Sequence, residues 1–265
     1  MTSLDTIGNM TNRIKTEYTN DGIALVSLSR PEKHNALDMA MFQSIDKTIK
    51  TLRKSKTVRA VVVSGEGEDF CTGLDVKSVM KNKLSAIKLL FKWLPGQSNL
   101  AQRVSTHWRQ IPAPVIFAVQ GRCWGGGLQI ALGGDFRFAT PDSSWSIMEA
   151  KWGLIPDMGG SVAFRELMAQ DKLLELAMTA KQVTGIEAKE LNLVTHLSQS
   201  PKEDAIKFAQ TLISTSPDVL AANKKLYQNT WWSSSRKALW LESFYQIKVL
   251  MGKNQSIAVK RATKE

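Results

Sequence analysis

Two carboxylates, Glu149 and Asp157, stand eight residues apart in the stretch EAKWGLIPDMGG, which otherwise consists mostly of apolar residues and glycine. An ionised carboxylate is costly to bury without a partner or a chemical task. Two interacting carboxyls can also differ in pKa, so that one acts as a base while the other stays protonated. Two carboxylates in such a stretch could therefore have a chemical task, and two surface charges beside a loop are the simpler alternative.

Two glycine turns provide a second chemical feature. In VVVSGEGEDFCTGLDVK a strand-like run is followed by Gly73-Leu74-Asp75, and in AVQGRCWGGGLQIA another is followed by the three glycines 125–127. Helix starts leave backbone N–H groups unpaired, and glycine lets a ligand approach them closely. Two such turns facing each other would present two N–H donors to one oxygen, as in an oxyanion hole. A P-loop is excluded, because Leu128-Gln129 follow where it needs Lys and Ser or Thr.

Strand-like and helix-like segments alternate around these features. Four runs are typical of buried strands, and they cover residues 22–29, 58–65, 114–121 and 135–139. Asp38 is placed to cap a helix whose apolar residues recur at helical spacing, namely Met41, Ile45, Ile49 and Leu52. A further helix is expected at 126–133. Strands that alternate with helices predict an α/β fold.

The pattern changes from about residue 202, where three helical segments follow one another with no strand between them. This tail is rich in aromatic residues, which include Trp231, Trp232, Trp240, Phe244 and Tyr245. A helical hairpin needs fewer large rings for its own core. The surplus predicts a subunit interface, and extra packing onto the parent domain is the alternative.

The composition limits the class of protein. The chain has 265 residues, of which 43% are hydrophobic and 22% charged, as is typical of a soluble globular protein with one large domain or a domain and a subdomain. The N-terminus does not read as a signal peptide, and no apolar run approaches the ~20 residues of a membrane span. Cys71 and Cys123 lack the spacing of a metal site or a disulfide framework. We therefore expect a cytoplasmic protein.

The net charge of +11 favours an acidic partner, such as nucleic acid, an anionic membrane surface or a polyphosphorylated small ligand. The basic residues are spread along the chain. The segment KNKLSAIKLLFKWL at 81–94 comes nearest to a basic amphipathic helix. Such a helix more often packs on its own domain than on a membrane.

The motifs together resemble those of the crotonase, or enoyl-CoA hydratase/isomerase, superfamily. They are SRPEKHNALD, SGEGEDFCTGLDVK, QGRCWGGGLQIALGGDFRFAT, IMEAKWGLIPDMGGS and ELAMTAKQVTGIEAKELNLV, in the order and spacing of that family. The resemblance runs from about residue 16 to at least 250. It implies a crotonase-type spiral of ββα units over residues 1–195 with the acyl-CoA site. A C-terminal all-helical oligomerisation region over 196–265 would then build a homotrimer or a dimer of trimers.

The resemblance also implies roles for individual residues. The thioester oxygen of an acyl-CoA would be held by the backbone N–H groups of Leu74 and Gly126. The segment with Lys33, Ala36 and Leu37 matches the family's coenzyme A contacts, and Lys77 matches a basic residue near the nucleotide. Further substrate contacts are expected at Gly73, Asp75, Gly125 and Gln129. Coenzyme A enters as part of the substrate, so no separate cofactor and no metal are expected, and nucleic acid is an unlikely partner.

The resemblance separates two chemistries. Hydratases of this family hold the attacking water between two glutamates, of which the second maps onto Glu149 and the first onto Gln129. An amide can hydrogen-bond water but cannot take its proton at neutral pH. Asp157 instead matches an aspartate of the dienoyl-CoA isomerases, which move protons between carbons of a conjugated chain. Those enzymes also have an aspartate at the Gln129 position, so two of their three acids are matched.

We therefore expect an enoyl-CoA or dienoyl-CoA isomerase that uses Glu149 and Asp157 as catalytic residues. An enoyl-CoA hydratase of fatty-acid oxidation that tolerates Gln129 is the first alternative. A weakly active acyl-CoA-binding or RNA-binding relative is the second alternative. Incorporation of water into the product separates isomerase from hydratase.

Overall fold

A six-stranded sheet forms the centre of the protein in the computed structural model, which describes residues 13–80 and 83–262. Its strand order is β1-β2-β3-β4-β6-β9, and every neighbouring pair except β1–β2 is parallel. The strands are β1 (Ile14–Tyr18), β2 (Ile23–Leu28), β3 (Ala60–Gly65), β4 (Val115–Val119), β6 (Phe136–Ala139) and β9 (His196–Leu197). A three-stranded sheet of order β5-β7-β8 lies beside it, made of β5 (Arg122–Trp124), β7 (Ser144–Ser146) and β8 (Gln182–Thr184).

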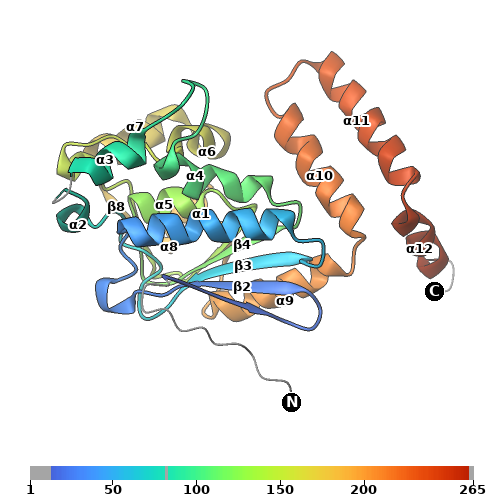
Figure 1. The fold of residues 1–265 in the computed structure, drawn as a ribbon, viewed down its shortest axis with the longest axis horizontal. Helices are drawn as coiled ribbons and strands as arrows, with labels where there is room; N and C mark the ends of the chain where they lie inside the picture. The colour runs from blue at the N-terminus through green and yellow to red at the C-terminus, as the bar shows by residue number, and fades with distance from the viewer. Residues whose placement is uncertain (1–12, 81–82, 263–265) are drawn as a thin grey trace.

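The four strands predicted from the sequence are all present, as β2, β3, β4 and β6. Every residue of β3 and β4 is buried, which fits their unbroken runs of β-branched and apolar side chains. Alternate residues of β3 enter different clusters: Val61 and Val63 pack with α1 (Met39–Lys54), whereas Val62 packs with α9 (Pro201–Ile213). The sheet is thus covered by helices on both faces, as Figure 1 shows.

The predicted cap of α1 is confirmed. The Asp38 carboxylate accepts a hydrogen bond from the Met41 N–H at 2.8 Å, and the predicted apolar face of α1 is buried. The other helices before the tail are α2 (Val76–Met80), α3 (Lys83–Leu90), α4 (Leu100–Thr106), α5 (Gly126–Ala131), α6 (Gly160–Leu167), α7 (Gln170–Thr179) and α8 (Gly185–Glu190). Short 3₁₀ turns lie at η1 (Pro31–Lys33), η2 (His107–Gln110) and η3 (Glu149–Trp152).

The C-terminal region contains α9, α10 (Pro217–Thr230), α11 (Ser235–Leu250) and α12 (Lys253–Ala262). Helix α9 packs on the sheet through Ala205 and Ala209, and β9 pairs with β6. The residue after the proposed boundary at 195 therefore still belongs to the main sheet. Helices α10 and α11 form a hairpin that extends away from the body of the protein (Figure 1). The division into two functional regions stays a prediction.

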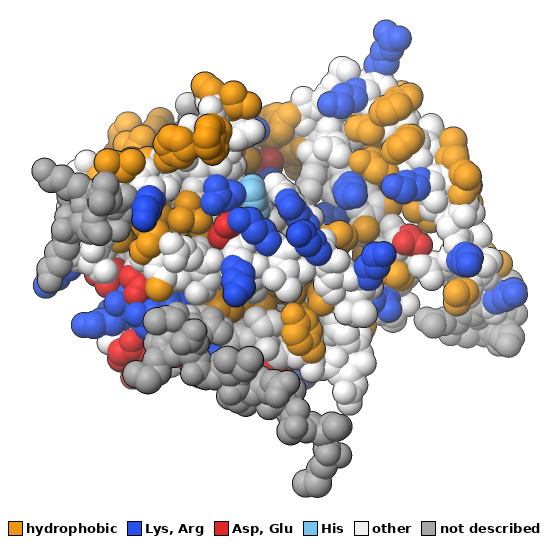
Figure 2. Space-filling view, in the orientation of Figure 1, with side chains coloured by type: hydrophobic (Ala, Val, Ile, Leu, Met, Phe, Trp, Pro, Cys, Tyr) orange, Lys and Arg blue, Asp and Glu red, His pale blue; other side chains and the backbone are white. Residues whose placement is uncertain are grey.

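The surface carries the basic and apolar side chains that the composition suggested. Figure 2 shows Lys and Arg side chains spread over the visible face, with exposed hydrophobic side chains on the C-terminal helices. The predicted helix at 81–94 is present from Lys83 to Leu90, and residues 81 and 82 lie outside the described residues. In the described part of the chain, no helix combines the length and the apolar character of a bilayer span.

Candidate active site

The two glycine turns lie against each other. Gly73 has a positive φ of 87°, and a Cβ atom added there would lie 3.2 Å from the Gly126 nitrogen and 2.8 Å from the Trp124 carbonyl oxygen. Leu37 fixes the first turn, because its N–H donates to the Gly73 oxygen and its oxygen accepts from the Asp75 N–H. Among residues 13–80 and 83–262, the N–H groups of Leu74 and Gly126 donate to no other group. Two neighbouring backbone donors are thus available to one ligand oxygen.

A cavity of about 250 Å³ opens at these turns and also contains both predicted carboxylates. Most of its wall is apolar. The residues that line it are Phe42, Thr72, Gly73, Leu74, Val76, Val79, Leu89, Leu90, Ala101, Gly125, Gly126, Met148, Glu149, Trp152, Leu154, Ile155, Asp157 and Met158. The structure therefore brings together three segments that are separate in the sequence: the turn at Gly73, the turn at Gly125 and the stretch with both carboxylates.

Glu149 begins η3 and lies beside the second glycine turn, where a Cβ atom on Gly125 would stand 3.4 Å from its Oε1. Its Oε1 accepts a hydrogen bond from the Gln129 side chain at 2.6 Å, whereas its Oε2 is buried and has no partner among the described residues. Burial raises the pKa of Glu149, and the charge of Asp157 raises it further. One carboxylate oxygen is thus fixed and the other is free to accept a proton.

Asp157 lies in the loop between η3 and α6 and forms part of the cavity wall. It is more exposed than Glu149, and partial burial raises its pKa as well. Its charge also raises the pKa of Glu149, by less than burial does. The negative charge of Asp157 thus disfavours ionisation of Glu149.

The Gln129 side chain lies behind Glu149 and is 1% exposed. Its amide nitrogen donates to Glu149 Oε1, and its amide oxygen accepts from the N–H groups of Met158 at 2.9 Å and Gly160 at 3.0 Å. Gln129 is not among the residues that line the cavity. The sequence predicted that Gln129 contacts the substrate. In the structure its side chain makes three hydrogen bonds to the protein.

Comparison with known proteins shows the family to which the chain belongs. The family model for enoyl-CoA hydratase/isomerase matches residues 18–254. The chain belongs to the enoyl-CoA hydratase/isomerase family. Its match to YngF of Bacillus subtilis, provisionally named an enoyl-CoA hydratase/isomerase, is 33% identical over 180 residues and covers 68% of this chain and 66% of YngF. The peroxisomal Δ(3,5)-Δ(2,4)-dienoyl-CoA isomerase of Arabidopsis thaliana is 29% identical over 195 residues, with 70% and 68% covered.

Solved structures of the family share the fold. A provisionally named enoyl-CoA hydratase from Streptomyces coelicolor A3(2) superimposes with a TM-score of 0.87 at 27% identity, covering 100% of this chain and 95% of that chain. The enoyl-CoA hydratase of Bacillus anthracis gives 0.86 at 24% identity, with 95% and 96% covered. The predicted crotonase-type α/β fold with a C-terminal helical region is confirmed.

The segment that was predicted to contact coenzyme A lies at and after η1. Lys33 and Lys77 are exposed, and Ala36 is half-buried with its carbonyl accepting from Arg30 Nη1 at 2.9 Å. Asp75 does not line the cavity and pairs with the same guanidinium at 2.9 Å. Arg30 thus ties the two segments together. Sequence reasoning missed this residue, although it directly precedes the segment PEKHNALD.

Sequence reasoning also missed the apolar wall of the cavity. Met148, Trp152, Leu154, Ile155 and Met158 surround the two carboxylates in the sequence and line the same cavity. The signal was the apolar character of the stretch between Glu149 and Asp157. Trp152, Leu154 and Ile155 are exposed, whereas Met148 and Met158 are buried.

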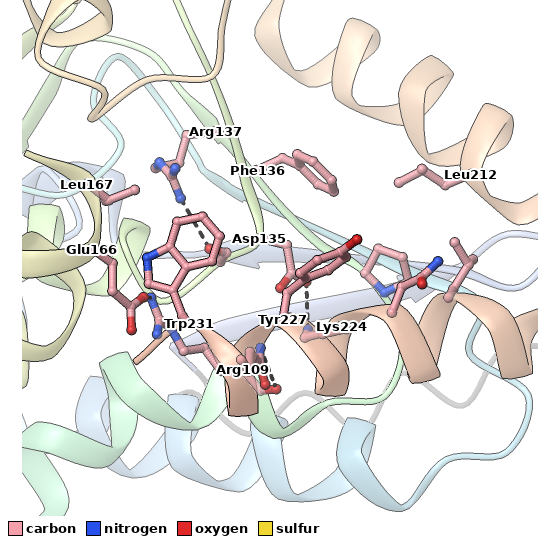
Figure 3. A pocket seen from close by; sticks show the side chains of 15 residues that line it. Arg109, Asp135, Phe136, Arg137, Glu166, Leu167, Leu212, Lys224, Tyr227 and Trp231 are labelled. Atoms are coloured by element: carbon pink, nitrogen blue, oxygen red, sulfur yellow. Dashed lines mark hydrogen bonds and ion pairs between the residues drawn. The ribbon is translucent and has the colours of Figure 1, made fainter. Parts of the chain in front are cut away.

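A larger cavity of about 410 Å³ lies elsewhere, between β6, α6 and α10 (Figure 3). Its charged side chains are largely occupied with one another: Lys224 pairs with Asp135 at 2.6 Å, and Arg109 pairs with Glu166 at 2.6 Å. It contains no predicted site residue and no unpaired carboxylate of the described chain. The smaller cavity is therefore the candidate active site.

Proposed function

We propose that this family member is an acyl-CoA isomerase that shifts carbon–carbon double bonds. One of Glu149 and Asp157 removes a proton from the substrate, and the other returns a proton to it. The observation that carries the proposal is the shared cavity, in which a buried, unpaired oxygen of Glu149 accompanies Asp157 and the two free N–H donors. The 29% identity to a dienoyl-CoA isomerase is consistent with it.

The reaction needs a carbon acid to lose one proton and to gain another. In the proposed mechanism one carboxylate removes a proton from the acyl chain, and the electrons move toward the thioester oxygen. The N–H groups of Leu74 and Gly126 would stabilise the resulting oxyanion. The other carboxyl, in its protonated form, returns a proton to a different carbon, so that the double bond has moved and no redox change has occurred. Burial raises the pKa of both groups, which favours a protonated carboxyl at this site.

The substrate would be a coenzyme A thioester with an apolar acyl group, because the cavity wall is mainly apolar. The exposed Lys33 and Lys77 are suited to the phosphates of coenzyme A. No further cofactor is needed for proton transfer of this kind. The cytoplasmic location predicted from the sequence stays a prediction.

The proposed assembly is a homotrimer or a pair of stacked trimers built through the C-terminal helices. Support comes from the many large apolar side chains that the helices expose, namely Tyr227, Trp231, Trp232, Leu239, Trp240, Phe244, Ile247, Leu250 and Met251. Contiguous exposed apolar surface of this kind is typical of protein–protein interfaces.

Deuterium exchange at the α and γ carbons of enoyl-CoA and dienoyl-CoA substrates, followed in heavy water beside turnover, tests the proposed reaction. Glu149→Gln and Asp157→Asn remove the titrating groups and keep the side-chain shape. Each variant should lose about 10²–10⁴-fold in kcat with little change in acyl-CoA affinity. Because both groups serve one relay, the double variant should lose much less than the product of the single losses.

Other outcomes separate the alternatives. If the wild-type protein incorporates water into the product, it is a hydratase. Normal turnover in Asp157→Asn would reduce the site to a single-carboxylate isomerase. Binding of acyl-CoA without turnover on any thioester would leave an acyl-CoA-binding relative, and the proposal of an isomerase would be wrong.

A further inference from the structure

We infer that Gln129 is a positioning residue that determines which carboxylate oxygen of Glu149 is left without a hydrogen-bond partner and that holds the loop carrying Asp157. The inference rests on the proposed function only in giving Glu149 a proton-transfer role. It goes beyond that function, because it assigns a task to a side chain that does not line the cavity and that touches Glu149 only at Oε1.

The orientation of the Gln129 amide is determined by its surroundings. The backbone N–H groups of Met158 and Gly160 both point at one end of the side chain, and a donor cannot satisfy them. The amide oxygen must therefore face these two groups, and the NH₂ group must face Glu149. All three contacts are buried or partly buried, with donor–acceptor distances of 2.6–3.0 Å.

This arrangement has a direct effect on Glu149. The amide N–H occupies Oε1, so Oε2 is left as the oxygen without a partner among the described residues. The donated hydrogen bond also favours the ionised carboxylate, against the burial and the Asp157 charge that disfavour it. Asp157 is the charged group acting on Glu149 from the facing loop, and Lys151 on η3 itself is exposed. Gln129 thus keeps Glu149 available as a base.

The same amide also fixes the other half of the pair. Met158 directly follows Asp157, and Gly160 is the first residue of α6. Gly159 caps this helix without any side-chain hydrogen bond, so the Gln129 oxygen provides an acceptor at its start. A Cβ atom on Gly160 would lie 2.8 Å from that oxygen, so the close contact requires glycine there. One side chain therefore positions both carboxylates.

The variant Gln129→Glu gives the sharpest test. It keeps an oxygen for the two backbone N–H groups but replaces the donor facing Glu149 with a second acceptor, so the two carboxylates must share a proton. We expect the acidic limb of the kcat profile to move to higher pH by at least one unit. At a pH well below the wild-type midpoint kcat should then fall at least tenfold, while KM for the acyl-CoA stays within about threefold. Gln182→Glu, which adds the same charge at an exposed position, is the matched control.

A second measurement uses the wild-type protein and needs no turnover. In ¹⁵N–¹H spectra the side-chain NH₂ resonances of Gln129 should titrate with the same pKa as the ¹³C-labelled carboxyl of Glu149. Resonances that do not follow Glu149 would overturn the inference, as would an unshifted pH profile in an active Gln129→Glu enzyme. Failure of the proposed function looks different: the wild-type protein would lack proton exchange, and Glu149→Gln would change nothing.

Discussion

At the scale of single residues, the main feature is a glutamate held in surroundings that disfavour its charge. Burial and the neighbouring Asp157 raise the pKa of Glu149, and its Oε2 has no partner in the described chain. An unpaired buried oxygen reduces the stability of the folded protein, because it has lost its hydration without a replacement. Such a cost is expected at a site that needs a reactive carboxyl.

This cost leads to a prediction about pH and stability. A raised pKa means that the folded protein binds the Glu149 proton more tightly than the unfolded chain does. Its contribution to stability is therefore present at acidic pH and is lost as the pH rises through the folded-state pKa. Glu149→Gln does not titrate, so it should raise Tm by about 2 °C or more at pH 7 and by much less near pH 4.

Thermal unfolding of the wild type and of Glu149→Gln across this pH range checks the prediction. Glu190→Gln, at an exposed position of α8, is the control and should leave Tm nearly unchanged at every pH. A Glu149→Gln variant that is less stable than the wild type at pH 7 would show that the carboxylate is stabilised by its surroundings.

At the scale of elements, the site depends on two turns that follow two parallel strands. Because β3 and β4 are neighbours in the sheet, the segments that follow them reach the same edge. The turn at Gly73 and the turn at Gly125 then meet so closely that a side chain at position 73 would contact Trp124 and Gly126. The distance between the Leu74 and Gly126 donors is therefore set by the absence of a Cβ atom.

Gly73→Ala tests this dependence. The new methyl group would stand 2.8 Å from the Trp124 oxygen, and the positive φ would strain the alanine. Moving one donor should cost about 2.7–4 kcal/mol of transition-state stabilisation, a loss of about 10²–10³ in kcat. Gly22→Ala is a matched control, with φ 88° and a Cβ 2.9 Å from the Thr57 oxygen, away from the cavity. It should lose stability and keep kcat; equal kcat losses in both variants would contradict the argument.

At the scale of the whole molecule, the C-terminal hairpin is poorly covered by the rest of the chain. Helix α10 has no buried residue, and α11 buries only Leu241 among its described residues. The hairpin is nevertheless held to the body through the Lys224–Asp135 ion pair at 2.6 Å and through Arg165, which lies over the Trp232 ring at 5.7 Å. Its attachment fixes a large apolar surface that another subunit would cover.

The rings of Trp240 and Phe244 are the best point to test the proposed trimer. They stack at 5.5 Å and are 62% and 47% exposed. The double variant Trp240→Asp/Phe244→Asp should dissociate the assembly into monomers, because it places two charges in an apolar interface. Size-exclusion chromatography with light scattering at micromolar concentration measures this. Lys237→Asp, which changes the net charge by the same amount on α11, should leave the assembly intact, and a monomeric wild type would contradict the proposal.

The sequence by itself determined the features that depend on local patterns. Buried apolar runs fixed the strands, Asp38 marked the start of α1, and the spacing of the glycine and acidic motifs indicated the family. These features are readable because backbone conformation and burial repeat with a short period along the chain. Only the family resemblance predicted that Leu74, Gly126, Glu149 and Asp157 lie close together.

Only the tertiary structure decided what the polar side chains contact. Gln129 carried the expectation of a substrate contact, but packing directs its amide to Glu149, 20 residues away, and to Met158 and Gly160. Likewise, α9 lies in the helical tail by sequence, yet it packs on the sheet. Hydrogen-bond partners and packing faces between distant segments follow from how the elements assemble, and no periodicity in the chain encodes them.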